Sequence, residues 1–221
     1  MIKSKRTGIL VVDVQPILRF GLRRLLEQEG DFEILGEADS VETGIEAVES
    51  LEPEVIILDL QFKGTGGIDL IKKVKQRAPR IGMLVYSAFD ETLYAERALR
   101  AGARGYLMKQ ESTDEVINAV RTVLSKEIYV SDQMGSKMLN KLVDGQPASS
   151  SPVERLSDRE LEVFQLIGQG QGTRQIAERL HLSIKTIESY RAHIKDKLNL
   201  RTAMELVHRA IHWAGNEAGN G

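Results

Sequence analysis

Four polar residues of complementary chemistry each follow directly on an apolar run: Asp13, Asp59, Ser87 and Lys109. A carboxylate accepts a phosphoryl group only where neighbouring groups neutralise the charge that builds up on the transferred oxygens. Asp59 is the candidate acceptor, and Asp13 could help it to hold a Mg²⁺ ion. Ser87 could donate a hydrogen bond to a phosphoryl oxygen, and Lys109 could pair with another as a point charge. Ala88 is small and would leave the approach to this pocket open.

The elements that must bring these residues together are read from the apolar runs. Five short runs, most of them rich in β-branched residues, alternate with amphipathic stretches, and Glu33 interrupts the second run as in an edge strand. The runs are Ile9–Val12, Phe32–Leu35, Val55–Leu58, Met83–Tyr86 and Tyr106–Met108, with helices expected at 16–29, 41–51, 67–77, 91–101 and 113–125. This alternation predicts a doubly wound, flavodoxin-like α/β domain over residues 7–125, with a five-stranded parallel sheet. Ligands of such sheets bind beyond the carboxyl ends of the strands, where the four polar residues fall.

Residues 126–152 are typical of a connection between two domains. Ser131 is a plausible N-cap for an amphipathic helix that carries Met134 and Met138 on or near one face. The stretch from Gly145 to Pro152 then lacks both periodicity and apolar mass, which indicates a flexible tether.

Residues 153–217 read as helical throughout, and four helices are expected in this second domain. Ser157 and Glu160 have the spacing of a capping box at the start of the first helix. The third helix, from Ile184 to about Leu198, has a polar, cationic side and an apolar side that we expect to be buried, made of Ile184, Ile187, Ile194 and Leu198. Between Arg174 and Arg201 the chain has seven cations and three carboxylates, although its total net charge is −2. A cationic helix in such a domain indicates nucleic-acid binding.

The composition bounds the remaining function classes. In 221 residues, 42% are hydrophobic and 28% are charged, which is the balance of a globular protein. No apolar run reaches the length of a membrane span, so we expect no membrane partner and a cytoplasmic location. The absence of cysteine excludes disulfides, thiol nucleophiles and thiolate metal sites.

The first 125 residues resemble the receiver domain of two-component response regulators. The resemblance rests on Ile9–Asp13, Ile57–Leu60 with Gly67 eight residues after Asp59, Val85–Ala88 and Gly102–Lys109, which match in order and spacing. It implies that a sensor histidine kinase phosphorylates Asp59 and that Mg²⁺ is held by Asp13, Asp59 and the backbone carbonyl of Gln61. It also implies that the Ser87 hydroxyl and the Tyr106 ring reposition as a switch when the phosphoryl group arrives.

The acidic pocket departs from the receiver pattern in two places. Val14 stands where the family usually has a second carboxylate that contacts the metal, and Phe62-Lys63 replaces the usual Met-Pro. One hypothesis is that Asp13 and Gln61 still hold Mg²⁺, more weakly, with Lys63 supplying some neutralisation. The alternative is a phosphorylation-independent receiver that serves as a dimerisation or ligand-sensing module. A phosphatase is disfavoured because Gln61, where a second carboxylate would be needed, is an amide.

Residues 156–213 resemble the LuxR-type helix-turn-helix of the NarL/FixJ response regulators. The matching residues are Leu156–Val163, Gly170, Ile176-Ala177, Leu182-Ser183, Thr186–Glu188, Arg191 and Lys197-Leu198. The resemblance implies a transcription regulator and not an enzyme, with double-stranded DNA as its partner, RNA polymerase as a further one, and a homodimer as the active form. Met204, Val207, His208 and Ile211 are the expected dimer residues.

The resemblance also assigns the DNA contacts. Base reading falls to the exposed face of the third helix, and backbone contacts fall to the flanking positions. The base-reading residues are Glu188, Ser189 and Ala192, and the others at the DNA interface are Thr173, Lys185, Thr186, Tyr190, Arg191, His193 and Lys195.

Overall fold

The computed structural model describes residues 6–62, 66–143 and 152–218, and the backbone alone for 215–218. The chain divides into two compact units, Met1–Asn140 and Lys141–Gly221. The division falls within the segment 126–152 expected to connect two domains. The tether expected from Gly145 lies, up to residue 151, outside the described residues, as does Lys63.

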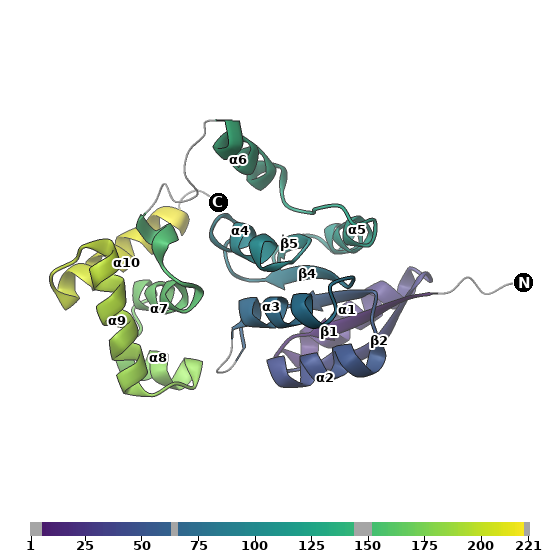
Figure 1. The fold of residues 1–221 in the computed structure, drawn as a ribbon, viewed down its shortest axis with the longest axis horizontal. Helices are drawn as coiled ribbons and strands as arrows, with labels where there is room; N and C mark the ends of the chain where they lie inside the picture. Colours follow the sequence, from purple (N-terminus) through teal and green to yellow (C-terminus); the bar gives the residue numbers. More distant parts are fainter. Residues whose placement is uncertain (1–5, 63–65, 144–151, 219–221) are drawn as a thin grey trace, which may run out of the picture. The chain divides into compact units, whose positions relative to one another are not determined.

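The first unit is built on a parallel sheet of five strands in the order β2-β1-β3-β4-β5 (Figure 1). The strands are β1 (Thr7–Val12), β2 (Phe32–Ala38), β3 (Val55–Leu58), β4 (Gly82–Ser87) and β5 (Gly105–Met108). This confirms the predicted receiver-type α/β fold, with the strand containing Glu33 at an edge. β2 is three residues longer than its apolar run, because its pairing with β1 continues as far as Ala38 opposite Val12.

Helices cover both faces of this sheet. They are α1 (Pro16–Gln28), α2 (Val41–Leu51), α3 (Gly67–Arg77), α4 (Glu91–Ala101) and α5 (Thr113–Leu124). Alternate residues of the strands, among them Ile9, Val11 and Ile57, form one buried cluster with Leu26 of α1 and Val120 of α5. Because successive side chains of a strand point to opposite faces, α1 and α5 share one face and the other strand residues pack under the remaining helices.

A further helix, α6 (Asp132–Val143), follows α5. Between the two, Tyr129 forms a parallel bridge with Gly105 at the free edge of β5. Ser131 caps α6 as predicted, since its hydroxyl accepts from the Met134 amide, and the Met134 side chain is buried.

The second unit contains the four predicted helices, α7 (Asp158–Gly168), α8 (Thr173–Leu180), α9 (Ile184–Leu198) and α10 (Ala203–Ala218), preceded by a short 3₁₀ turn at Pro152–Arg155. Ser157 and Glu160 form the predicted capping box of α7. The rings of Phe164 and Trp213 meet with centroids 5.3 Å apart and tie α7 to α10. A β-carbon at Gly168 would lie 2.6 Å from the backbone oxygen of Ala210, so these two helices approach too closely for any side chain there.

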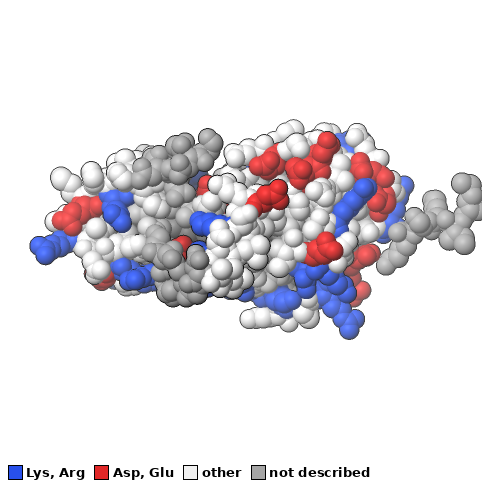
Figure 2. Space-filling model, turned by 90° about the horizontal axis from the view of Figure 1, so that it is seen from above, with Lys and Arg blue, Asp and Glu red and all other residues white. Residues whose placement is uncertain are grey.

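Charged side chains of both signs are spread over the surface seen in Figure 2, in keeping with 30 basic and 32 acidic residues in the chain. In the part of the chain that the structure describes, no helix is long and apolar enough to cross a membrane.

Candidate functional site: an acidic pocket and a cationic helix

Backbone hydrogen bonds at the ends of the strands place the pocket residues. The Asp13 amide donates to Ala38, the Asp59 amide to Val12, and the Lys109 amide to Ser87, each to a backbone oxygen at 2.9–3.0 Å. Each polar residue therefore continues the hydrogen-bonding pattern of its strand by one position. The sheet itself thus brings the four residues to one edge.

The side chains of these four residues form one hydrogen-bonded cluster. The Ser87 hydroxyl donates to Oδ1 of Asp59 at 2.7 Å, and the Leu60 amide donates to the same oxygen at 2.7 Å. The Lys109 ammonium donates to Oδ2 of both carboxylates, at 2.7 Å to Asp13 and 2.8 Å to Asp59. Asp13, Asp59 and Ser87 are buried. The pocket thus holds two carboxylates against one cation.

This imbalance is reflected in the protonation equilibria. Burial raises the pKa of the Asp13 carboxyl, and the hydrogen bonds from Lys109 and from the Gln15 amide offset this only in part. Burial alone would lower the pKa of Lys109, but its interactions with Asp59 and Asp13 outweigh burial and raise it. A pocket with surplus negative charge favours the approach of a further cation.

Close packing behind Asp59 requires a glycine at the start of α3. The Gly67 amide donates to the Leu60 oxygen at 3.0 Å. A β-carbon at Gly67 would lie 2.4 Å from Cα of Leu60 and 2.5 Å from the Asp59 oxygen. Any side chain here would displace the backbone that carries the candidate acceptor.

The oxygens needed for Mg²⁺ are partly present. One ammonium contacts both Asp13 and Asp59, so their carboxylates are close enough for a single cation to reach both. These hard oxygen donors suit Mg²⁺, which keeps several of its waters in proteins. Val14, half-buried beside Asp13, offers no ligand, and no three acidic or imidazole side chains converge as a metal site among the described residues. The two carboxylates fit the ion as a sparse protein ligand set, and the Gln61 carbonyl remains a predicted further ligand.

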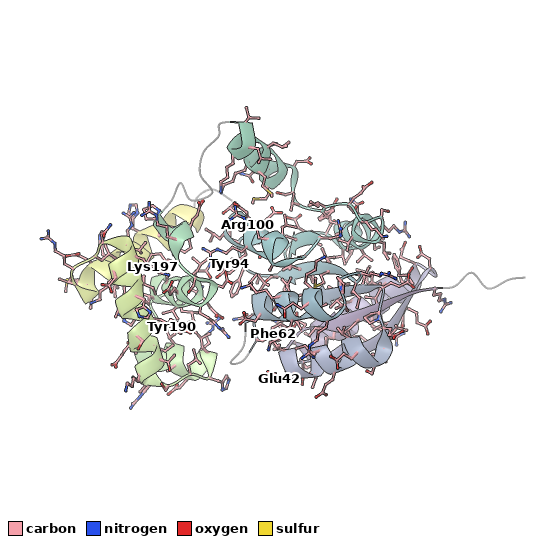
Figure 3. The ribbon with its side chains drawn as sticks, in the orientation of Figure 1. Glu42, Phe62, Tyr94, Arg100, Tyr190 and Lys197 are labelled. Atoms are coloured by element: carbon pink, nitrogen blue, oxygen red, sulfur yellow. The ribbon has the colours of Figure 1, made fainter. Side chains whose placement is uncertain are left out.

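The predicted switch residues are linked through the loop after β4. The Phe89 amide donates to the Ser87 hydroxyl at 3.3 Å, and the Phe89 oxygen accepts from the Tyr106 hydroxyl at 2.8 Å. Tyr106 is fully buried, which raises the pKa of its hydroxyl well above the ordinary value. The Phe89 ring also stacks on Tyr94, labelled on α4 in Figure 3. Ala88, between Ser87 and Phe89 in the chain, is exposed, as an open approach requires.

Helix α9 carries most of the predicted DNA contacts, and its start is fixed by a cap. Ser183 accepts from the Thr186 amide at 3.0 Å, and the two hydroxyls are 2.8 Å apart, so Thr186 faces the cap. Ile187 and Ile194 are fully buried. Ile184 was expected beside them but is 43% exposed, because it is the first residue of the helix and has no preceding turn to pack beneath.

The remaining candidate DNA contacts divide by exposure. Lys185, Glu188, Ser189, Ala192 and His193 are exposed, whereas Thr173, Thr186, Tyr190, Arg191 and Lys195 are half-buried. Burial lowers the pKa of Arg191, and among the described residues no acidic side chain pairs with it. A partly desolvated guanidinium of this kind favours an anionic partner. Thr173 begins α8, where Gly172 is the N-cap and its amide donates to Oε1 of Gln175 at 2.8 Å.

The sequence did not reveal how α9 is held. Glu160 of α7 is buried and accepts from the Ser157 amide at 2.7 Å and from the Lys197 ammonium at 2.6 Å, with Nδ1 of His193 3.9 Å away. Burial acts to raise the pKa of Glu160, but the hydrogen bonds from Lys197 and Ser157 outweigh it and lower the pKa. Figure 3 labels Lys197 on α9. The sequence indicated only the capping role of Glu160, because its pairing with Lys197 spans 37 positions.

Comparisons with known proteins assign both units. Residues 9–121 match the response regulator receiver domain, and residues 154–210 match the luxR family of bacterial regulatory proteins. The chain is a response regulator. It belongs to the NarL/FixJ group, with a LuxR-type helix-turn-helix, and its relatives are transcription regulators rather than enzymes, as predicted.

Two full-length relatives illustrate how far the similarity of this response regulator extends. The oxygen regulatory protein NreC of Staphylococcus carnosus is 35% identical over 92% of this chain and 96% of its own. The putative positive transcription regulator of virulence factors BvgA of Bordetella pertussis is 33% identical over 90% of this chain and 94% of its own. Both receiver and helix-turn-helix are thus shared in the same order.

A solved structure shares both domains as well. RcsB of Salmonella enterica serovar Typhimurium, bound to promoter rprA in the presence of the phosphomimetic BeF3⁻, is 28% identical to this response regulator. It covers 92% of this chain and 98% of its own, with a TM-score of 0.63. None of these comparisons supports a phosphorylation-independent receiver, the alternative that Val14 left open.

Proposed function

We propose that a sensor histidine kinase phosphorylates Asp59 and that this modification controls sequence-specific binding of DNA by α9. The observation that carries the proposal is the cluster of Ser87, Lys109 and Asp13 around the Asp59 carboxylate. The RcsB structure, solved on a promoter with a phosphate mimic present, supports the pairing of these two events.

The pocket residues have separate roles in the transfer. A carboxylate oxygen of Asp59 forms a bond to phosphorus as the bond from phosphorus to the histidine nitrogen of the kinase breaks. Lys109 pairs with the charge on the transferred oxygens, and the Ser87 hydroxyl leaves Asp59 to donate to one of them. Mg²⁺, held by Asp13, Asp59 and the Gln61 carbonyl, supplies neutralisation of that charge when bound. Tyr106 follows Ser87 through Phe89.

On DNA, α9 enters the major groove. Glu188, Ser189 and Ala192 read base edges, while Lys185, Arg191 and Lys195 contact phosphates, with Thr173, Thr186, Tyr190 and His193 beside them. Two copies bind two half-sites, paired through α10, whose Met204 is 81% exposed and Ile211 50% exposed. Val207 and His208 complete that dimer face. RNA polymerase is a further protein partner of the DNA-bound dimer. Because it would act on the chromosome, the protein would work in the cytoplasm. Its two domains are residues 7–125 and 153–217, joined by residues 126–152.

Intact mass measurement tests the phosphorylation step. After incubation with a small phosphodonor and Mg²⁺, we expect a gain of one phosphoryl group that Asp59→Asn abolishes. Asp69→Asn, on α3 outside the pocket, is the matched control and should label normally. A gain that persists in Asp59→Asn, or no gain where an ordinary receiver labels in parallel, would contradict the proposal.

Titration with duplex DNA tests the second step, using a duplex selected from a random pool by the full chain. Arg191→Ala and Lys195→Ala should each weaken binding and reduce the slope of log affinity against log salt by about one unit. Lys73→Ala, an exposed cation on α3 of the receiver unit, should change neither. An unchanged affinity and slope for both α9 variants would exclude this helix as the interface.

A further inference from the structure

The receiver unit continues past α5 in a short segment that is bound to the sheet. The Tyr106 amide donates to the Tyr129 oxygen and the Tyr129 amide donates to the Arg104 oxygen, both at 2.9 Å. The Tyr129 hydroxyl donates to Glu115 of α5. The segment that leads into α6 is therefore held at the edge of β5 through both the amide and the carbonyl of Tyr129.

Helix α6 begins at a contact with α4. Ser131 accepts from the Met134 amide, as the N-cap, and donates twice to Glu91: its amide to Oε1 at 2.8 Å and its hydroxyl to Oε2 at 2.5 Å. Glu91 is the first residue of α4 and is only 8% exposed. Hydrogen bonds to a buried carboxylate are the strong kind. The start of α6 thus depends on the position of a side chain on α4.

The turn that carries Glu91 also reaches the Asp59 pocket. Its first residue, Ser87, donates to Asp59 at 2.7 Å, and its third, Phe89, contacts both Ser87 and Tyr106. Asp90, the N-cap of α4, accepts from the Thr92 amide at 2.7 Å. Five consecutive residues, 87–91, therefore join the candidate acceptor to the contact with Ser131.

We infer that Glu91 and Ser131 form a latch through which the state of the Asp59 pocket controls the start of α6. The inference rests on the proposed phosphorylation. When a phosphoryl group draws the Ser87 hydroxyl away from Asp59, the 87–91 turn moves, and the two hydrogen bonds to Ser131 loosen. Glu91 touches neither phosphate nor metal, so it is a positioning residue that passes the change to the linker helix.

Hydrogen exchange on the full chain tests the latch, with beryllofluoride and Mg²⁺ as the probe. In the unsubstituted protein the probe should speed exchange of the Ser131 and Met134 amides by about tenfold, the factor expected from loss of a charge-assisted hydrogen bond. Glu91→Gln should make the residue-131 amide, and Ser131→Ala the Met134 amide, exchange fast from the outset, and the probe should add nothing at those positions. Amides at 87–89 should still respond to the probe in both variants.

Two substitutions serve as controls, and the outcomes are distinct. Glu127→Gln, an exposed acid in the same segment, and Ser136→Ala, an exposed serine of α6, should keep the full response. A response at 87–89 without one at α6, or a response at α6 that survives Glu91→Gln, overturns the latch and leaves the proposed function standing. If the amides at 87–89 also fail to respond to the probe, both the latch and the proposed function are contradicted.

Discussion

Each unit contains a buried carboxylate paired with a lysine, and the pKa of the carboxylate is shifted in opposite directions in the two pairs. Glu160 accepts from a backbone amide and from Lys197, and these donors lower its pKa despite burial. Asp13 shares Lys109 with Asp59, and its pKa is raised. A carboxylate with enough donors of its own stabilises a fold, whereas two that share one cation are left ready for another. The first arrangement positions a helix, and the second suits a site for chemistry.

Of the substitutions that test this comparison, removal of the shared cation should have the largest effect on stability. Lys109→Ala leaves Asp13 and Asp59 buried without their ammonium, so we expect the receiver unit to lose about 3 kcal/mol of unfolding free energy at neutral pH. Denaturant unfolding followed by far-UV circular dichroism measures the loss. Adding Asp13→Asn to Lys109→Ala should restore part of it, and a double variant no more stable than the single one would show that charge imbalance is not the cause.

Glu160→Gln should cost somewhat less, about 2 kcal/mol, in the helix-turn-helix unit. Because the folded pKa of Glu160 is lowered, its stabilising contribution is present above the ordinary value of 4.5 and is lost as the pH falls through the folded pKa. The difference between Glu160→Gln and the unsubstituted protein should therefore shrink below about pH 4.5. Trp213, which packs on Phe164, gives the fluorescence signal for this unit. A difference that is constant with pH would contradict the ionic role.

Val14→Asp should sharpen the contrast by adding the missing carboxylate. We expect Mg²⁺ affinity to rise about tenfold, equivalent to about 1.4 kcal/mol, because a third carboxylate enters a pocket already short of cations. Calorimetric titration with Mg²⁺ measures it, and Val14→Asn, equal in size but uncharged, is the control. Equal affinities for the two variants would show that the Val14 position does not face the ion.

Asp13→Asn should have the smallest effect, and in the stabilising direction. The pKa of Asp13 is raised, so its contribution to stability is present below 3.8 and is lost as the pH rises through the folded pKa. At pH 7 the substitution should raise the melting temperature by a few degrees while weakening Mg²⁺ binding. A lower melting temperature at pH 7 would show that the Lys109 pair outweighs burial.

Much of this architecture follows from local pattern. Strands of the sheet are apolar runs ending in Asp13, Asp59, Ser87 and Lys109, and parallel pairing alone brings these ends together. The meeting of these four side chains could therefore be predicted before any geometry was known. Pattern also gives two of the caps, since Ser131 and Ser157 each sit just before a helical run.

Contacts between distant segments could not be predicted in this way. Glu160 with Lys197 and Glu91 with Ser131 join residues 37 and 40 positions apart on helices whose relative rotation no periodicity fixes. The exposure of Ile184 is a further case. Its apolar type suits the buried side of α9, but the helix starts there and leaves it uncovered. Tertiary packing determines these contacts and exposures, and local sequence patterns do not predict it.

The Tyr129 bridge has a practical consequence for anyone who wishes to express the receiver alone. It occupies the outer edge of β5, which would otherwise present unpaired backbone groups to solvent. A fragment ending at Ser125, where the apolar pattern stops, would uncover that edge and invite strand addition between molecules. A fragment ending at Asn140 keeps the edge closed and should remain monodisperse at concentrations where the shorter one aggregates.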